Sequence, residues 1–197
     1  MGETLVDLLR HGEPVGGKKY RGYSVDDPLS ETGWSQMWQA VADKSDWDCI
    51  VSSPMLRCRA FAEQLSDKIK KPFFVENDLE EVGFGVWEGR TTAQVKTENE
   101  AEFYAFHLDP VNNRPLHAED LDVFFDRVVT AYQKVLEEYE GKHCLIVAHA
   151  GTIRAIMAYL LDAPVSSMYR IRVNNAGLTR IRYDIRGPVL EFHQADL

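Results

Sequence analysis

Histidine and arginine side chains stand directly after apolar segments at several points in the sequence. The apolar run LVDLL is followed by Arg10 and His11, and the run LIVA by His149 and a helix-like segment with Arg154. A third run, CIVSS, leads into a segment that carries Arg57 in the first turn of an expected helix. Ligands of open α/β sheets bind beyond the carboxyl ends of the strands. If the three runs are strands of one sheet, these side chains converge at that edge.

This set of side chains suits the handling of a phosphate group. Arginine presents a fork of N–H donors that matches phosphate oxygens. A neutral imidazole can attack phosphorus, and a second imidazole can donate to the phosphoryl oxygens as their charge changes. The segment DLEEVGFGVWEG adds two adjacent carboxyl groups, Glu80 and Glu81. A carboxylic acid placed in such a site can protonate the leaving oxygen of an ester.

A metal centre is the competing interpretation of the same residues. Two histidines beside arginines, with no HxH or HExxH spacing, supply too few ligands for one. The arginines and imidazoles can themselves neutralise phosphate charge. We therefore expect no metal and no cofactor.

Apolar runs and amphipathic segments alternate along most of the chain, which favours an α/β fold. Several runs are apolar without alternation, as in strands that are buried on both faces of a parallel sheet. We predict a three-layer sandwich with a mostly parallel central sheet and helices on both faces. The expected strands are TLVDLL, DCIVSS, PFFVE, HCLIVAH, MYRIRV, LTRIRYD and VLEFH, and the expected helices cover 31–44, 54–69, 121–139 and 151–162.

The chain shows no repeat and no linker, so residues 1–197 are predicted to form a single domain. Residues 88–120 are polar and only weakly periodic. They are expected to form a small helical insert, a cap over the active site. Ser30 is the expected N-cap of the first helix because its hydroxyl can accept from the first free backbone N–H groups.

Composition excludes several classes of partner. The net charge is −9, with 45% hydrophobic and 27% charged residues, which is ordinary for a globular protein but argues against a nucleic-acid binder. The N-terminus does not predict a signal peptide, and no run approaches the roughly 20 apolar residues of a membrane span. Three cysteines without a CxxC pair indicate buried, reduced thiols and a cytoplasmic location. A homodimer is compatible with the sequence, although no segment requires one.

The motif LLRHGEP resembles the signature of the histidine phosphatase superfamily, the phosphoglycerate mutase-like fold. DDPLSETG, IVSSPMLRCRAFAE, LEEVGFGVWEG and LIVAHAGTIR match further motifs of that family in the same order. The resemblance covers nearly the whole chain, and five ordered motifs are highly specific.

The resemblance implies a role for each residue that matches the pattern. His11 is the nucleophile that becomes phosphohistidine, and Glu81 is the proton donor, with Glu80 as the adjacent alternative. The phosphate pocket is lined by Arg10, Arg57 and His149.

The chain departs from the family pattern in the loop after RHGE, which reads PVGGKKYRG and has no asparagine. The candidates to replace that phosphate ligand are the backbone groups of Gly16 and Gly17 and the side chains of Lys18, Lys19 and Arg21. The segment before the long helix reads HAED where Gly-Gly-Glu-Ser is common. Candidate substrate-binding residues are Arg21, Gly22, Trp87 and Glu119.

The function that the resemblance implies is a metal-independent phosphomonoesterase acting on a small-molecule phosphate ester. The size and motifs are similar to α-ribazole 5′-phosphate phosphatases of cobalamin assembly, and broad-specificity sugar phosphatases look equally similar. The alternatives are a phosphoglycerate mutase-type phosphoryl transfer, a non-catalytic phosphate-binding module and a phosphohistidine-protein phosphatase. Exclusion of water from the closed site would favour the mutase.

Overall fold

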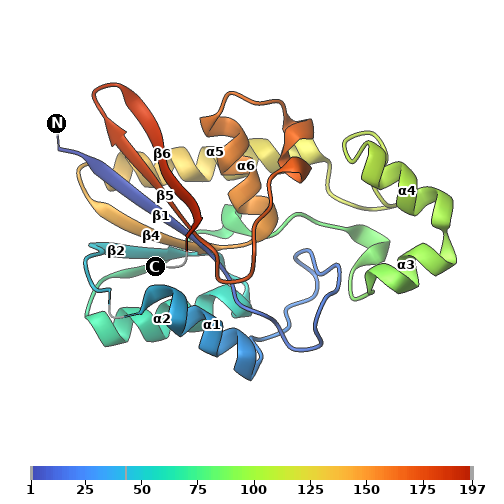
Figure 1. Ribbon diagram of the computed structural model, residues 1–197, viewed down its shortest axis with the longest axis horizontal. Helices are drawn as coiled ribbons and strands as arrows, with labels where there is room; N and C mark the ends of the chain where they lie inside the picture. The colour runs from blue at the N-terminus through green and yellow to red at the C-terminus, as the bar shows by residue number, and fades with distance from the viewer. Residues whose placement is uncertain (1, 43, 196–197) are drawn as a thin grey trace.

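A six-stranded sheet with the strand order β3-β2-β4-β1-β5-β6 forms the centre of the computed structural model, which describes residues 2–42 and 44–195 (Figure 1). The pairs β1–β4, β4–β2 and β2–β3 are parallel, and β1–β5 and β5–β6 are antiparallel. The strands are β1 (Thr4–Arg10), β2 (Cys49–Ser52), β3 (Phe73–Val75), β4 (His143–Ala148), β5 (Leu178–Asp184) and β6 (Gly187–Ala195).

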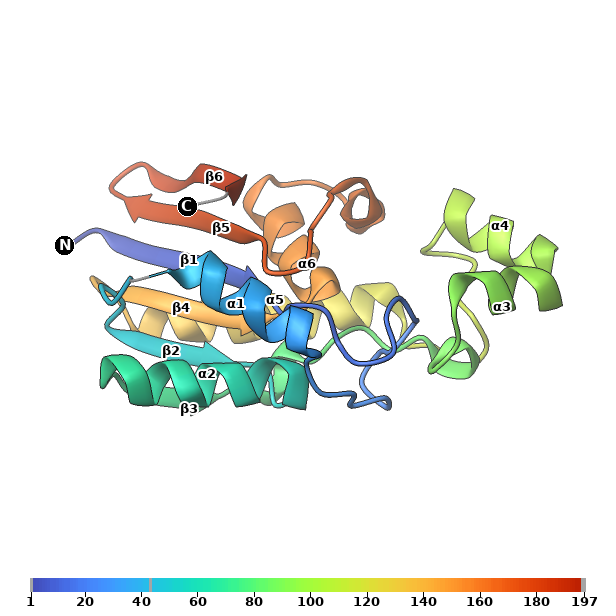
Figure 2. The same cartoon turned by 60° about the horizontal axis from the view of Figure 1, so that its bottom comes forward.

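Helices cover both faces of this sheet, as predicted for an α/β sandwich. Helices α1 (Glu31–Val41) and α2 (Leu56–Ile69) lie on one face, and α5 (Leu121–Glu138) and α6 (Ala150–Leu160) lie on the other (Figure 2). Successive residues of β1 are buried because each face of the strand meets its own helical layer. Val6 and Leu8 pack with α5 and α6, and Leu9 packs with α1 and α2.

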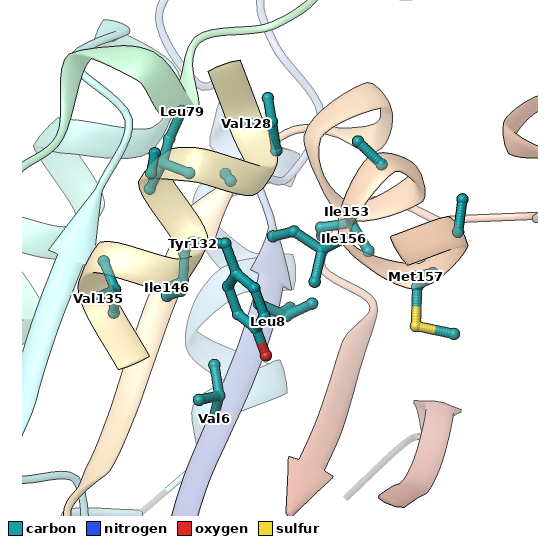
Figure 3. Packing of buried hydrophobic residues seen from close by; sticks show 14 of the residues in the cluster. Val6, Leu8, Leu79, Val128, Tyr132, Val135, Ile146, Ile153, Ile156 and Met157 are labelled. Carbon is teal, nitrogen blue, oxygen red and sulfur yellow. The ribbon is translucent and has the colours of Figure 1, made fainter. Parts of the chain in front are cut away.

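The long helix α5 shows how the sequence pattern produces this packing. Its buried residues recur at helical spacing and include Phe124, Val128 and Tyr132. Figure 3 shows Tyr132 beside Leu8 of β1 and Ile156 of α6, all within one cluster of buried residues. The Asp120 side chain accepts from two backbone N–H groups at the start of the helix, and such a cap contributes about 1 kcal/mol.

The predicted N-cap of α1 is present, because the Ser30 hydroxyl accepts from the Gly33 backbone N–H. The helix itself ends at Val41 and not at residue 44. Ala42 takes a positive φ of 45°, which stops the helix. Residue 43 lies outside the described residues.

Residues 88–120 hold two short helices, α3 (Thr92–Glu98) and α4 (Glu100–Leu108). Both lie beyond the carboxyl ends of β1 and β4, away from the two helical layers (Figure 2). A small apolar cluster of Trp87, Val95, Phe103 and Phe106 holds them together. This segment therefore has a core of its own, next to the edge where the motif residues were expected to meet.

The segment MYRIRV was predicted to be a strand, and this prediction is wrong. A 3₁₀ helix, η3, covers Val165–Arg170, and no strand follows before β5. The segment MYRIRV cannot add to the sheet next to β5, because both edges of β5 are already hydrogen-bonded, to β1 and to β6. The segment is instead fixed by the buried Met168 side chain and by the Ile171 carbonyl, which accepts from Arg154 Nε.

The three cysteines are buried and carry no disulfide, as the sequence indicated. Within residues 2–42 and 44–195, no helix is both long and apolar enough to cross a lipid bilayer.

Candidate active site

The register of the central sheet places two histidines side by side. β1 pairs with β4 in parallel, with Arg10 opposite Ala148, so His11 and His149 each follow the last paired position. Their ring centroids are 5.2 Å apart, with an angle of 64° between the planes. The residue after His11, Gly12, lies against the start of α1, where a Cβ would stand 2.2 Å from the Gly33 carbonyl oxygen.

The hydrogen bond that His11 makes determines which ring nitrogen is free. Nδ1 lies 2.8 Å from the Gly12 carbonyl oxygen, which can only accept, so Nδ1 carries the hydrogen. Nε2 of the neutral ring therefore keeps its lone pair. Burial, followed by the positive charges of Arg10 and Arg57, lowers the pKa of His11 well below its usual value. His11 is thus held as a neutral imidazole, which is the form that can act as a nucleophile.

His149 is completely buried, and the sequence reasoning did not identify the residues that hold it. Its Nε2 lies 2.7 Å from the Ser53 hydroxyl oxygen, and the Cys58 sulfur lies 3.6 Å from the same nitrogen. Burial, with Arg57 next in importance, lowers the pKa of His149 well below its usual value. Ser53 and Cys58 belong to the motif SSPMLRC, where they read as strand-end and helix residues rather than as site residues.

Two arginines, the buried Arg57 and the half-buried Arg10, bring positive charge to this edge. Arg10 Nη1 donates to the Val173 carbonyl at 2.7 Å, and Arg57 donates to the carbonyls of Val25 and Gly22 at 3.1 and 2.9 Å. The Nε atoms of Arg10 and Arg57 are buried, and neither has a hydrogen-bond partner within the described chain. A buried N–H donor without an acceptor destabilises a protein by about 1–3 kcal/mol. An anion that accepts from the two Nε–H groups would remove this cost. Burial also lowers the pKa of Arg10 to about 10.

Glu81 lies in the wall of the same cavity, and its carboxylate is held by two backbone N–H groups. Gly151, in the first turn of α6, donates to it at 3.0 and 3.3 Å, and Val82 donates at 3.0 Å. Glu80, the alternative proton donor, is not among the residues that line this cavity.

The cavity has a volume of about 190 Å³ and joins the motif residues with several that were not predicted. It is lined by Arg10, His11, Lys19, Tyr20, Arg21, Gly22, Arg57, Glu81, Phe84 and Arg154. A second cavity of about 260 Å³ shares Arg10, His11, Lys19, Tyr20 and Arg21, and extends to Lys18, Thr92 and Asn175. Tyr20, Phe84 and Thr92 carried no signal in the sequence, because single aromatic or hydroxyl side chains occur in any loop.

Two of the candidate substrate-binding residues line the cavity. Arg21 also supports the loop: it donates to Asp27 at 3.0 Å and to the carbonyls of Val15 and Gly17. Gly22 accepts from Arg57 through its carbonyl. In the loop that lacks the asparagine, Lys18, Lys19 and Arg21 all lie at the cavity walls.

The other two candidates, Trp87 and Glu119, lie elsewhere, contrary to the prediction. Trp87 is only 2% exposed and packs inside the cluster of the insert, where it contacts the Tyr20 ring from behind at 5.0 Å between centroids. Glu119 forms an ion pair with Arg127 and accepts from the Gly83 backbone N–H. The Trp87 ring packs against apolar neighbours, and the Glu119 carboxylate is paired with Arg127. Neither side chain lines the cavity.

No group of three or more His, Cys, Asp or Glu side chains within residues 2–42 and 44–195 is arranged to hold a metal ion.

Comparison with known proteins identifies the family. Residues 6–196 match the model of the histidine phosphatase superfamily, branch 1, and the chain belongs to this family. The Bifunctional protein Rv2228c of Mycobacterium tuberculosis is 30% identical over 180 residues, which are 89% of this chain and 49% of that protein. The chain thus spans about half the length of the first curated relatives that it matches.

Other relatives match over most of their length. The Adenosylcobalamin/alpha-ribazole phosphatase of Salmonella typhimurium is 28% identical over 171 residues, which cover 84% of each protein. The solved structure of Bacillus stearothermophilus YhfR superposes with a TM-score of 0.86 at 24% identity and covers 95% of both chains, which establishes the same fold. A protein named as a phosphatase is thus among the relatives that match over most of their length.

Proposed function

We propose that this chain is a metal-independent phosphomonoesterase that hydrolyses a small-molecule phosphate ester through a phosphohistidine intermediate on His11. The observation that carries this proposal is the state of the His11 ring. Burial lowers the pKa of His11 well below its usual value, its Nδ1–H is bonded to a carbonyl, and the residue lines a cavity with Arg10 and Arg57, whose buried Nε donors have no partner in the described chain.

In the first step, His11 Nε2 attacks phosphorus, and the bond between phosphorus and the ester oxygen breaks. Glu81 gives its proton to the leaving oxygen, so the product is a neutral alcohol. Arg10 and Arg57 bind the phosphoryl oxygens and stabilise the charge that moves onto them. His149 lines neither cavity and its Nε2 contacts the Ser53 hydroxyl, so we propose that it acts through its close packing against the His11 ring.

In the second step, a water molecule attacks the phosphohistidine. The Glu81 carboxylate accepts a proton from this water, the P–N bond breaks, and inorganic phosphate leaves. His11 returns to its neutral form and Glu81 to its protonated form, so the enzyme is ready for another cycle. The residues alternate between donor and acceptor as microscopic reversibility requires.

The substrate that we propose to test first is α-ribazole 5′-phosphate. The similarity to the Salmonella phosphatase supports this choice. The cavity walls next to Glu81 carry the aromatic rings of Tyr20 and Phe84, which are suitable neighbours for a planar base. Asn175 and Thr92 in the adjoining cavity offer polar groups for sugar hydroxyls.

The test is phosphate release from a panel of esters in excess EDTA. The panel contains p-nitrophenyl phosphate, ribose 5-phosphate, 3-phosphoglycerate and α-ribazole 5′-phosphate, and His11→Ala is the control. Chelator-resistant release that disappears in His11→Ala is expected, with α-ribazole 5′-phosphate giving the highest kcat/KM. Isomerisation of phosphoglycerate without hydrolysis would show a mutase, and no turnover of any ester would refute the proposal.

A further inference from the structure

The segment that carries Glu81 is held from behind by one side chain of helix α5. The Arg127 guanidinium donates to the carbonyl of Asp78 at 2.7 Å, to that of Glu80 at 3.2 Å and to that of Glu81 at 3.4 Å. The Asp78 carbonyl belongs to the short 3₁₀ helix η1 (Asn77–Leu79), and those of Glu80 and Glu81 lie in the irregular stretch between η1 and η2 (Gly85–Trp87). No strand or long helix fixes that stretch, so its side-chain contacts decide where it lies.

Glu119 fixes the orientation of this guanidinium. Its two carboxylate oxygens accept from Arg127 Nε at 2.7 Å and from Nη2 at 3.0 Å, a bidentate geometry that sets the plane of the fork. Glu119 also bonds to the same stretch directly. Its carboxylate accepts from the Gly83 N–H at 3.1 Å, and its own N–H donates to the Gly83 carbonyl at 3.1 Å.

The pair is well shielded but lies apart from the reacting groups. The Arg127 and Glu119 side chains are 20% and 13% exposed, so water competes weakly for their hydrogen bonds. Neither residue lines the catalytic cavity. Their hydrogen bonds instead go to backbone groups before, at and after Glu81, while the Gly151 N–H of α6 donates to its carboxylate.

We propose that the Glu119–Arg127 pair positions the proton donor: it fixes the backbone of residues 78–83 so that the Glu81 carboxyl group stays beside the leaving oxygen. This inference rests on the proposed function, in which Glu81 is the acid. Arg127 and Glu119 are positioning residues, since they act on the reaction only through Glu81.

The proposal predicts a selective loss of activity. A displacement of about 1 Å in a catalytic group can cost about 100-fold in rate. Proton donation matters for an alkyl ester, whose leaving alkoxide is strongly basic, and matters little for p-nitrophenyl phosphate. Substitutions that break the Glu119–Arg127 ion pair should therefore lower kcat on alkyl esters. The kcat on p-nitrophenyl phosphate and the KM values for both kinds of ester should stay nearly unchanged.

The experiment compares ribose 5-phosphate with p-nitrophenyl phosphate for Arg127→Met, Arg127→Lys and Glu119→Gln. We expect Arg127→Met to lose about 10- to 100-fold in kcat on ribose 5-phosphate and less than about 3-fold on p-nitrophenyl phosphate. Arg127→Lys should recover part of the loss, because an ammonium can still donate to one or two of the carbonyls. Lys134→Met is the matched control: Lys134 lies on the same helix as Arg127, its side chain is 67% exposed and pairs with Glu76, and its loss should change neither rate.

Equal losses on the two esters, or no loss on ribose 5-phosphate, would overturn the proposal. If Arg127→Met does not fold, as its thermal midpoint would show, the milder Glu119→Gln and Arg127→Lys decide by the same ratio of rates. Glu81→Gln is measured alongside them. If Glu81→Gln does not lose more activity on ribose 5-phosphate than on p-nitrophenyl phosphate, the assignment of Glu81 as the acid fails. If Glu81→Gln shows this selective loss but the Arg127 and Glu119 variants do not, only the positioning role fails.

Discussion

Substitution of Gly151 by alanine should displace Glu81, the proposed proton donor, without harming the fold. A Cβ at this position would stand 2.2 Å from Glu81 Oε1 and 3.2 Å from Val82 Cγ1. Ordinary van der Waals contact begins at 3.4 Å, so the carboxyl group has to retreat by about 1 Å. Gly151 lies in the first turn of α6, where alanine favours a helix by up to about 1 kcal/mol over glycine.

The expected cost of this displacement is about 100-fold in kcat on an alkyl phosphate such as ribose 5-phosphate. Hydrolysis of p-nitrophenyl phosphate, whose leaving group scarcely needs a proton, should fall by less than about 3-fold. The assay is steady-state kinetics on both esters, with a thermal melt to show that the variant is folded. A folded Gly151→Ala that keeps full activity on ribose 5-phosphate, or that loses both activities equally, would refute the role of Glu81.

Two further predictions concern buried charge. Burial raises the pKa of Asp7, but hydrogen bonds from Arg180, His143 and Trp47 outweigh it and lower the pKa from 3.8 to about 2. Asp7 therefore stabilises the fold by about 2 kcal/mol above pH 4, and this is lost as the pH falls toward 2. In urea unfolding, the free energy of unfolding should fall by this additional amount between pH 4 and pH 2 in the wild type and not in Asp7→Asn. The same pH dependence in both proteins would contradict the prediction. In NMR titrations, the His11 and His149 rings should stay neutral at pH 6.5 and gain a proton only below it, and a midpoint at or above 6.5 for either ring would contradict their burial beside Arg57.

The arrangement of the catalytic centre was largely predictable because it depends on strand ends. Apolar runs without alternation identified parallel strands, and parallel strands bring their carboxyl ends to one edge. The positions of Arg10, His11 and His149 follow from that rule alone. Arg57 needed one more step, namely that helix α2 starts a few residues after β2.

The parts that could not be predicted depend on contacts between distant segments. Trp87 stands beside the acidic motif in sequence, but its ring is taken up by an apolar cluster with α3 and α4, which periodicity did not reveal. Glu119 reads as a free carboxylate until its partner Arg127, in the second turn of α5, is placed beside it. Ser53 reaches His149 across 96 positions of the chain. Pairings of this kind are fixed by packing and leave no local pattern.

The central claim is that a phosphoryl group is carried by His11, and trapping the phosphoenzyme tests it most directly. Phosphohistidine survives alkaline quenching, so rapid mixing with p-nitrophenyl phosphate, an alkaline quench and mass spectrometry of the digested chain would locate it. We predict one phosphoryl group on the peptide that contains His11, bonded through Nε2 because Nδ1 is held by the Gly12 carbonyl, and no label in His11→Ala. A phosphoryl group on another residue, or turnover that persists in His11→Ala, would contradict the account.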